Sequence, residues 1–393
     1  MDRIRVLLAG VGGYGGRYLE EFLRADNTVF ELVGAVDPFA SSSRLYEELK
    51  NRHIPIYKTP SDFFLKKKAD LAVISSPIHT HYPYVITCLE NESNVLCEKP
   101  VTASLEELDE LIALEKKSSF FVAVGFQLCF SQDLIALKQD ILDGLFGRPL
   151  EFKALRFLRR GTRYYKRNNW AGKLQFEGKL ILDSPLQNGC SHEIEAMLFL
   201  LGSEMHQSSA VDSVEAELLQ CRPDIENYDA AAVRFRSCTG TKILFYTAHC
   251  VEESTPEPLG EFRFEKALIR WNGTPNSGFT AFLNNGGIKN YNSDDRDKDN
   301  VYQKLHETAR AIRNGIPPVC TLETVRPHTQ CVTLVQQFPI AKVPPEKITQ
   351  SVTEDDGVFF YVPNLMETFF QAYEKNSLPS EIGFSPNSPK VKK

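Results

Sequence analysis

A glycine-rich turn near the start of the chain restricts the fold more than any other feature. Gly10, Gly12 and Gly15 form a GxGxxG pattern. An apolar run at residues 4–8 precedes it, and a helical pattern at residues 15–25 follows. The first glycine of such a turn allows a tight bend, the second lets a pyrophosphate approach the backbone, and the third lets the helix pack on the strand. The turn therefore predicts a dinucleotide-binding Rossmann domain; without this context, the pattern would fit a flexible glycine turn.

An acidic residue completes the pattern. Asp37 lies at the end of the second apolar run, 22 residues after Gly15. A carboxylate there can accept hydrogen bonds from the ribose hydroxyls of NAD, and it would repel a 2′-phosphate. Residues 41–44, Ser-Ser-Ser-Arg, follow closely and could bind that phosphate instead. The electrostatic argument favours NAD as the cofactor, and NADP stays the alternative.

The patterns along the chain predict an α/β fold. Short apolar runs alternate with helical patterns up to Gly125, as in a parallel sheet covered by helices on both faces. One helix is expected to begin after Ser104, because Glu107 follows three residues later. Beyond Gly125, longer strand-like runs separated by turns predict a mostly antiparallel sheet. Further helices are expected at residues 192–201, 301–314, 322–336 and 359–376.

A chain of 393 residues has the length of two domains. We predict an N-terminal, NAD(P)-binding Rossmann domain with a parallel sheet at residues 1–125. A C-terminal α/β domain with the mostly antiparallel sheet is predicted at residues 126–375. Residues 376–393 are rich in Ser, Pro and Lys, and we expect them to be a loose tail.

Composition excludes several classes of protein. With a formal net charge of −6, the chain is a poor general binder of nucleic acid or anionic membranes. It contains no apolar run of about 18 residues that would span a bilayer. The nine cysteines are odd in number and form no CxxC, which indicates reduced thiols. The first apolar run leads straight into glycines and does not look like a signal peptide. We therefore expect a cytoplasmic protein with neither a nucleic-acid nor a membrane partner.

Further motifs give the sequence a resemblance to a known family. They are Ser76-Pro77-Ile78-His79-Thr80-His81, Cys97-Glu98-Lys99-Pro100 and Asn188-Gly189-Cys190-Ser191-His192. Together with the glycine turn, they resemble the Gfo/Idh/MocA family, named for glucose–fructose oxidoreductase, inositol dehydrogenase and a rhizopine-catabolism protein. The Glu-Lys-Pro motif is the most specific element. The resemblance covers nearly the whole chain.

This resemblance implies a nicotinamide cofactor and a carbohydrate-like small-molecule substrate, such as a sugar or polyol. It implies that the second domain binds substrate and forms a homodimer or homotetramer through its open sheet. It also implies that Lys99 and His192 face the reacting carbon. Oxidation of a secondary alcohol moves a hydride to nicotinamide and a proton to a base. His192 fits the acid/base role, and Lys99 can stabilise the developing alkoxide.

The histidine motif departs from the family pattern. Relatives commonly carry an aspartate four residues before the histidine, and this chain has Asn188 there. Asp183, nine residues before His192, is a candidate to compensate. Glu195 stands where relatives often carry an aspartate. The candidate catalytic residues are therefore Lys99, His192, Asp183 and Asn188.

The cofactor is expected to contact the glycine turn, the end of the second strand and the two family loops. These residues are Gly10, Gly12, Gly13, Tyr14, Gly15, Asp37, Ser76, Pro77, His81, Glu98 and Lys99. His81 is expected to cap the following helix or to line the cofactor cleft. His79 and His81 have no further ligands at a supporting spacing, so no metal site is predicted. His249, His306 and His328 belong to no constellation and are expected to be structural or exposed.

A basic segment is the remaining candidate site. Six cations and no acid fall within residues 156–167: Arg156, Arg159, Arg160, Arg163, Lys166 and Arg167. The segment would suit a substrate loop in which aromatic rings stack on a sugar and an arginine binds a carboxylate or phosphate. A solvated surface loop and a nucleic-acid patch are the alternatives. The predicted substrate contacts are Tyr165, Arg167, Asn168 and Trp170, with Lys99, Asn188 and His192.

These observations favour an NAD(P)-dependent dehydrogenase acting on a CH–OH group of a sugar, inositol or sugar acid. Two alternatives stay open. One is a glycosidase that retains NAD and oxidises its substrate transiently. The other is a non-enzymatic NAD or sugar sensor, which the change to Asn188 would permit and the presence of Lys99 and His192 opposes.

Overall fold

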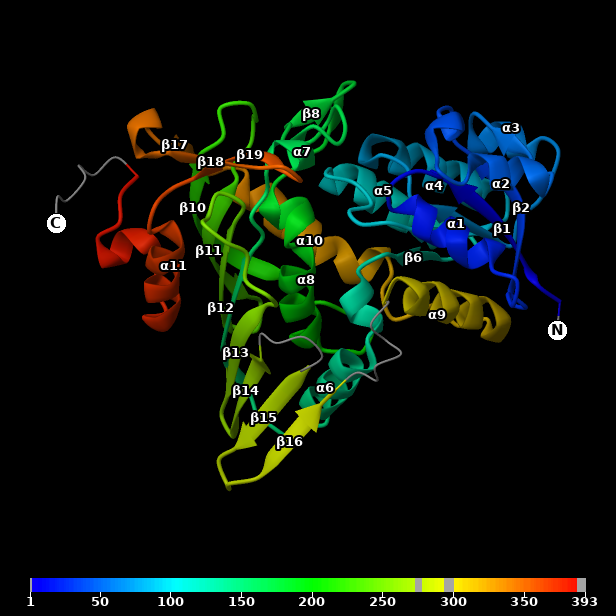
Figure 1. Cartoon of the computed structure of the whole chain (residues 1–393). Helices are drawn as coiled ribbons and strands as arrows, with labels where there is room; N and C mark the ends of the chain where they lie inside the picture. Colours follow the sequence, from blue (N-terminus) through cyan, green and yellow to red (C-terminus); the bar gives the residue numbers. More distant parts are fainter. Residues whose placement is uncertain (1, 273–277, 293–299, 387–393) are drawn as a thin grey trace. The chain divides into compact units, whose positions relative to one another are not determined.

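The computed structural model describes residues 2–272, 278–292 and 300–386. Within these ranges the chain forms two compact units, each with its own large sheet (Figure 1). The first unit contains the chain up to Ser131 and also residues 300–326. The second contains the segment that begins at Gln132 and the segment that begins at Pro327. The predicted boundary at residue 125 falls six residues before the division between the units.

A parallel sheet forms the centre of the first unit. Its strand order is β3-β2-β1-β4-β5-β6, the order of a doubly wound dinucleotide-binding fold. The strands are β1 (Ile4–Ala9), β2 (Phe30–Val36), β3 (Ile56–Tyr57), β4 (Leu71–Ile74), β5 (Asn94–Cys97) and β6 (Val122–Val124). All four residues of β4 are buried, as expected for a strand covered on both faces. The predicted Rossmann fold is confirmed.

Helices connect these strands. They are α1 (Gly15–Leu23), η1 (Ala40–Ser42), α2 (Tyr46–Asn51), α3 (Pro60–Phe64), η2 (Ile78–Thr80), α4 (His81–Glu90), α5 (Leu105–Glu115) and η3 (Gln127–Phe130). The predicted cap of α5 is present, because the Ser104 hydroxyl accepts the backbone N–H of Glu107 at 3.2 Å. The sequence analysis missed α3, which Thr59 and Asp62 begin with a reciprocal capping box.

A helix from much later in the chain completes the first unit. This helix, α9 (Asn300–Asn314), lies at the predicted place in the sequence. Its Leu305 and Ala309 share one apolar core with Tyr18 and Phe30 of the Rossmann layers. The sequence analysis assigned residues 301–314 to the second domain, whereas the apolar side of α9 is buried in the first unit.

A buried ion pair fastens α9 to the sheet. The Lys304 ammonium, which is 0% exposed, donates to Oε1 of Glu98. The Tyr18 hydroxyl donates to the same oxygen at 2.6 Å. Burial lowers the pKa of Lys304, and the Glu98 carboxylate opposes that change. Side chains from α1, from α9 and from the residue that follows β5 thus share one charged contact inside the unit.

The second unit contains a nine-stranded sheet, in the order β16-β15-β14-β13-β7-β12-β11-β10-β17. Its strands are β7 (Pro149–Phe157), β10 (Val211–Gln220), β11 (Ala230–Ser237), β12 (Lys242–Ala248), β13 (Leu259–Phe264), β14 (Ala267–Asn272), β15 (Phe279–Leu283), β16 (Ile288–Tyr291) and β17 (Ile340–Lys342). Only the β7–β12 and β10–β17 pairs are parallel among these strands. The predicted mostly antiparallel sheet is confirmed.

Helices and short hairpins surround this sheet. They are α6 (Gln132–Leu142), α7 (Thr162–Tyr165), β8 (Gln175–Phe176), β9 (Lys179–Leu180), η4 (Pro185–Gly189), α8 (Ser191–Leu200), η6 (Pro345–Lys347), β18 (Thr349–Thr353), β19 (Gly357–Tyr361), α11 (Leu365–Glu374) and η7 (Pro379–Ile382). A further helix, α10 (Leu322–Val335), contains residues of both units. The helix expected at residues 359–376 begins later, because residues 357–361 pair with β18 as a strand.

The C-terminal segment differs from the expected loose tail. Leu378 is buried in the core of the second unit, together with Phe369 of α11. Glu381 pairs with Arg234 of β11 at 2.5 Å. The sequence analysis overlooked these contacts because the segment is rich in Ser, Pro and Lys. Residues 387–393 of the predicted tail lie outside the described residues.

The sequence analysis expected reduced thiols and no membrane-spanning segment. All nine cysteines are free thiols, and only Cys238 is exposed. Among the described residues, no helix combines the length and the apolar character needed to cross a membrane.

Replacing Lys304 with methionine should lower the free energy of unfolding by about 3 kcal/mol, because the Glu98 carboxylate would stay buried without its cation. Arg310→Met is the matched control on the same helix. Arg310 pairs with Glu307 at 2.9 Å, but 66% of its side chain is exposed, so its loss should leave stability nearly unchanged. Chemical denaturation followed by circular dichroism measures both variants. Equal stability of the two variants would contradict a stabilising role for the buried pair.

Candidate functional site

Three loops meet at one edge of the Rossmann sheet. Strands β1, β4 and β5 are neighbours and run parallel. The glycine turn follows β1, Ser76-Pro77 follows β4, and Glu98-Lys99-Pro100 follows β5. Because parallel strands all end at the same edge, the motifs that the sequence analysis singled out lie together there. This carboxyl edge is where doubly wound folds bind dinucleotides.

The glycine turn has the geometry that a pyrophosphate requires. Gly10 has a φ of +89°, and a Cβ there would lie 2.6 Å from the carbonyl oxygen of Ser75. A Cβ at Gly15 would lie 2.0 Å from the Gly10 carbonyl oxygen. At Gly12, by contrast, no atom of the described residues lies within 4 Å of the position that a Cβ would take. Gly10 and Gly15 therefore permit the packing of the turn, and Gly12 leaves its backbone approachable for a phosphate.

Asp37 lies beside the glycine turn, immediately after β2. Its carboxylate accepts the backbone N–H groups of Val11 at 3.0 Å and Phe39 at 2.8 Å. These contacts fix the carboxylate, and its remaining lone pairs can accept ribose hydroxyls. Arg44, the candidate for binding a 2′-phosphate, forms an ion pair with Glu20. The local charges therefore fit NAD better than NADP.

His81 connects the other two loops. It is buried at the start of α4, where Nε2 lies 2.7 Å from the Ser76 carbonyl oxygen and Nδ1 lies 2.8 Å from that of Pro100. Burial lowers the pKa of His81, and a neutral ring can donate to only one of these carbonyls. Its contacts join the Ser76-Pro77 loop to the turn that carries Lys99. His81 was expected to cap the helix or to line the cofactor cleft; in the structure it also bridges these two loops.

Tyr14 and Glu98 have partners within the first unit. The Tyr14 hydroxyl donates to Oε1 of Gln127 at 3.2 Å, and the Lys304 ammonium lies 3.3 Å from that hydroxyl. Glu98, a predicted cofactor contact, directs its carboxylate to Tyr18 and Lys304. Glu98 therefore acts within the protein core. The sequence analysis missed Lys304 because no local motif marks it.

Lys99 follows β5 directly. The residue is half-buried, and the peptide bond between Lys99 and Pro100 is cis. The Lys99 backbone N–H lies 3.4 Å from Oε2 of Glu98. The backbone that carries the candidate catalytic lysine is therefore held by Glu98 on one side and, through Pro100, by His81 on the other.

The candidate histidine lies in the second unit, in the first turn of α8. A π-helical turn, η4, precedes this helix and contains Asn188. Asp183 is buried, and its Oδ1 accepts the Asn188 side-chain N–H at 2.9 Å. Its Oδ2 accepts the Gly172 backbone N–H at 2.6 Å. The structure thus brings Asp183 and Asn188 together beside the turn that leads to His192. Position 188 has no carboxylate of its own, but it is hydrogen-bonded to the carboxylate of Asp183.

His249 packs against Gly189 of that turn. A Cβ added to Gly189 would lie 2.6 Å from the His249 Nε2, so only glycine fits there. The other ring nitrogen lies 2.8 Å from the Tyr165 hydroxyl. Burial holds the pKa of His249 well below its usual value, and the neighbouring Arg160 adds to this effect. The sequence analysis gave His249 no role beyond a structural one, and its contacts explain why it is needed.

The predicted substrate contacts differ in accessibility. Tyr165 is only 8% exposed, and its hydroxyl faces His249. Arg167 is exposed; its guanidinium lies 3.8 Å from the ring centre of Tyr164 and 3.6 Å from Asp183. The Asn168 side chain accepts the backbone N–H of the half-buried Trp170 at 3.1 Å. Tyr165 thus supports the loop from inside, whereas Arg167 and Trp170 remain partly accessible.

Buried thiols contribute no nucleophile to this region. Burial raises the pKa of Cys190, two residues before His192, to about 12. Cys221, Asp229 and Cys250 form a buried cluster elsewhere in the second unit. The Asp229 carboxylate there accepts the backbone N–H of Cys221 at 2.8 Å. Burial raises the pKa of Asp229 to about 6, and the cluster belongs to the apolar core.

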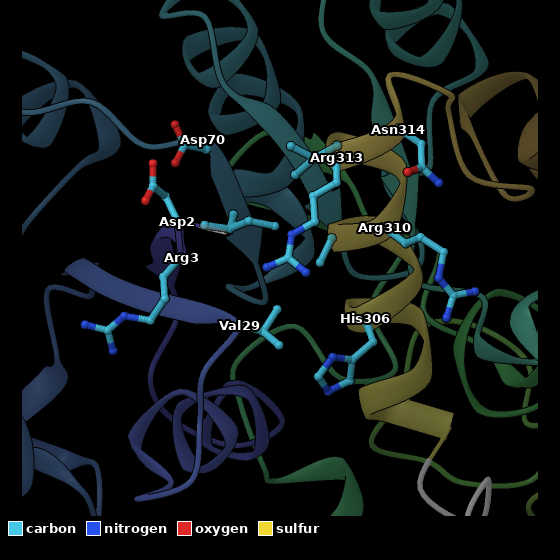
Figure 2. A pocket seen from close by; sticks show the side chains of 11 residues that line it. Asp2, Arg3, Val29, Asp70, His306, Arg310, Arg313 and Asn314 are labelled. Carbon is cyan, nitrogen blue, oxygen red and sulfur yellow. The ribbon is translucent and has the colours of Figure 1, made fainter.

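Figure 2 shows a cavity of about 600 Å³ in the first unit. Arg3 and Asp70 line one side, and His306 and Arg313 of α9 line the other. The cavity borders Ile4, the first residue of β1, whereas the glycine turn follows the last residue of that strand. It therefore lies at the edge of the sheet opposite to the predicted cofactor site.

Comparison with known proteins supports the assignment of the first unit. Residues 4–126 match a family described as "Oxidoreductase family, NAD-binding Rossmann fold". The chain is 24% identical over 210 residues to an inositol 2-dehydrogenase of Rubrobacter xylanophilus, covering 52% of this chain and 54% of that protein. It is 26% identical over 147 residues to a myo-inositol 2-dehydrogenase of Thermotoga maritima, covering 37% and 43%. The chain thus spans about half the length of these curated relatives. The family match confirms the expected NAD-binding family for residues 4–126.

The fold also matches solved structures. The WlbA dehydrogenase of Bordetella pertussis, in complex with NADH and UDP-GlcNAcA, superposes with a TM-score of 0.68 at 19% identity. The match covers 85% of this chain and 96% of that protein. It shows that the two proteins share a fold.

Replacing Glu195 with glutamine should change how stability depends on pH. Glu195 is buried on α8, and burial raises its pKa to about 8 from 4.5. The folded state keeps this proton where the unfolded state loses it, so this group lowers the stability of the native chain as the pH rises from about 4.5 to about 8. The glutamine variant should lose less stability across that window. Urea denaturation at pH 5 and pH 8 measures the difference, with the exposed Glu204→Gln as control. Identical pH dependence in Glu195→Gln and the native chain would contradict a proton held at Glu195.

Proposed function

We propose that this chain, whose residues 4–126 match the Gfo/Idh/MocA oxidoreductase family, is an NAD-dependent dehydrogenase acting on a CH–OH group. The proposed substrate is a sugar, inositol or sugar acid. One observation carries the proposal: the glycine turn, Asp37 and Lys99 follow β1, β2 and β5, which are parallel strands of one sheet and end at the same edge. A hydride acceptor and a cation can therefore be presented at the same edge.

Each candidate catalytic residue has a distinct role in this proposal. A bound nicotinamide supplies the acceptor for the hydride that leaves the carbon. His192 takes the hydroxyl proton as general base. The Lys99 ammonium stabilises the negative charge that develops on the oxygen. Asp183 and Asn188, joined by a hydrogen bond, orient the turn that carries His192.

The names of similar proteins support the substrate class. Two relatives are inositol dehydrogenases, and the WlbA structure holds a nucleotide sugar acid. We extend the proposal to a cytoplasmic homodimer or homotetramer. The free thiols support a reducing location, and the wide sheet of the second unit supports self-association.

Asp37 should make the protein prefer NADH to NADPH by at least about tenfold in affinity, because its carboxylate repels the 2′-phosphate. Asp37→Ser should reduce that ratio. Arg44→Ala is the control: Arg44 is paired with Glu20, so its removal should leave the ratio unchanged. Titration followed by nicotinamide fluorescence gives both affinities. A native preference for NADPH would assign the 2′-phosphate to the 41–44 segment and contradict the choice of NAD.

Lys99→Ala should reduce kcat by about a hundredfold or more, because the developing alkoxide loses its cation. The Kd for NADH should change by less than about threefold. A screen of polyols, sugars and sugar acids with NAD identifies the substrate for these assays. Lys116→Ala is the matched control, since Lys116 is exposed and pairs with Glu323. Native turnover in Lys99→Ala would remove the proposed role of Lys99.

The same screen separates the alternatives. Release of a free sugar from a glycoside without net NADH would indicate the glycosidase. Tight binding of NADH and of a sugar, with no turnover of any compound, would indicate the sensor. Failure to bind either nicotinamide cofactor would contradict both the dehydrogenase and the NAD-retaining glycosidase.

A further inference from the structure

The basic segment after β7 contains cations in different electrostatic environments. Arg156 lies 3.8 Å from Glu193, and Arg167 lies 3.6 Å from Asp183. These two arginines therefore have carboxylate partners within the second unit. Their positive charges are largely compensated where they stand.

Other arginines of the segment bind neutral groups. Arg159 donates to the Ser351 hydroxyl at 2.5 Å. Arg163 is exposed and donates to the backbone carbonyl of Asp355 at 2.7 Å. A solvated guanidinium such as that of Arg163 needs no carboxylate, because water stabilises its charge.

Arg160, like Arg159, has a buried Nε without an acceptor among the described residues, but unlike Arg159 it forms no side-chain hydrogen bond there. It is half-buried, and in the described part of the chain no carboxylate lies within ion-pair distance of it. The guanidinium lies 4.7 Å from the ring centre of Tyr164, and the backbone N–H donates to the His249 carbonyl at 3.2 Å. The arginine is therefore anchored by backbone and ring contacts while its charge is left uncompensated.

Nearby cations make this environment more positive. Arg167 also lies against the Tyr164 ring, at 3.8 Å. Asp183 is the acid paired with Arg167, and it also receives the amide of Asn188. Two guanidinium groups on one ring repel each other, and the carboxylate of Asp183 forms its ion pair with Arg167. An anion bound at Arg160 would remove that imbalance.

The location connects Arg160 with the candidate catalytic turn. Its backbone N–H donates to the carbonyl of His249 at 3.2 Å, and the His249 ring lies against Gly189, three residues before His192. Arg160 is therefore close to the π-helical turn that begins α8, and a group bound there would lie beside the residues proposed to act on the substrate.

We infer that Arg160 binds an anionic group of the substrate, a carboxylate or a phosphate. The planar guanidinium presents two parallel N–H donors that match either group. The inference rests on the proposed function for the rest of the substrate, which carries the CH–OH group. It also revises the sequence analysis, which chose Arg167 as the substrate arginine: Arg167 already has Asp183 as its partner, whereas Arg160 has none in the described residues.

Two matched pairs of compounds test the inference. D-Gluconate and D-sorbitol share a carbon chain and differ in the carboxylate, and glucose 6-phosphate and D-glucose differ in the phosphate. Calorimetric titration of the NADH-loaded protein should show at least about tenfold tighter binding of one anionic compound than of its neutral partner. The pair that shows this difference identifies the carboxylate or the phosphate. Equal affinities within both pairs would overturn the inference.

Substitutions then assign the anion to Arg160. Arg160→Gln should weaken binding of the anionic compound by about tenfold or more and leave the neutral partner unchanged. Arg163→Gln is the matched control, three residues along the same segment, and should change neither affinity. If Arg160→Gln does not fold, Arg160→Lys serves as the second variant. It keeps the charge and should retain part of the preference for the anionic compound. Equal losses in Arg160→Gln and Arg163→Gln would overturn the assignment.

Turnover is scored separately, so that the two proposals can fail independently. Anion binding that requires Arg160, with no oxidation of any CH–OH compound, would contradict the dehydrogenase and leave the anion site standing. Oxidation of neutral compounds alone, with Arg160→Gln fully active, would contradict the anion site and leave the dehydrogenase standing.

Discussion

The buried contact between Glu98 and Lys304 is the interaction on which the first unit depends. Glu98 precedes the candidate catalytic Lys99, and Lys304 lies 206 residues later on α9. The same carboxylate receives the hydroxyl of Tyr18 on α1. A charge buried at this depth is tolerated only with its partner, so α9 must be in place for the β5 loop to take its conformation. The geometry of the candidate cofactor edge therefore requires residues that lie 206 positions apart in the chain.

This dependence explains which parts of the fold could be predicted from the sequence. The glycine turn, Asp37 and the Ser104 cap are local patterns, because the residues that decide them lie close together in the chain. The helix at α9 was equally local and was predicted correctly. Its place in the first unit was not, since that is decided by apolar contacts and by one ion pair with residues far away in the sequence. Residues 359–361 of β19 were assigned to a helix because the pairing of this strand with β18 is a tertiary contact.

The candidate site follows the same division. Family motifs were enough to select Lys99, His192 and the glycines. The sequence analysis proposed Asp183 as a carboxylate that compensates for Asn188, without predicting a contact between them. In the structure, the two side chains are hydrogen-bonded. The support of Gly189 by His249 had no signal in the sequence, because the two residues meet only when β12 ends beside the turn before α8. The basic segment was recognised as a group, but only its partners, Glu193 and Asp183, show which arginines are compensated.

Charge balance connects the proposals for the second unit. A base that takes a proton becomes positive, and a positive environment opposes that step. Arg160 and Arg167 lie near the turn before His192, and Asn188 brings no charge to offset them. The Asp183 carboxylate, held against Asn188, offsets part of this field. An anionic substrate at Arg160 would offset more of it at the moment when the imidazole is protonated. On this argument, Asn188 and the uncompensated Arg160 have the same explanation. The proposed anionic substrate would itself supply the negative charge that the chain lacks at this place.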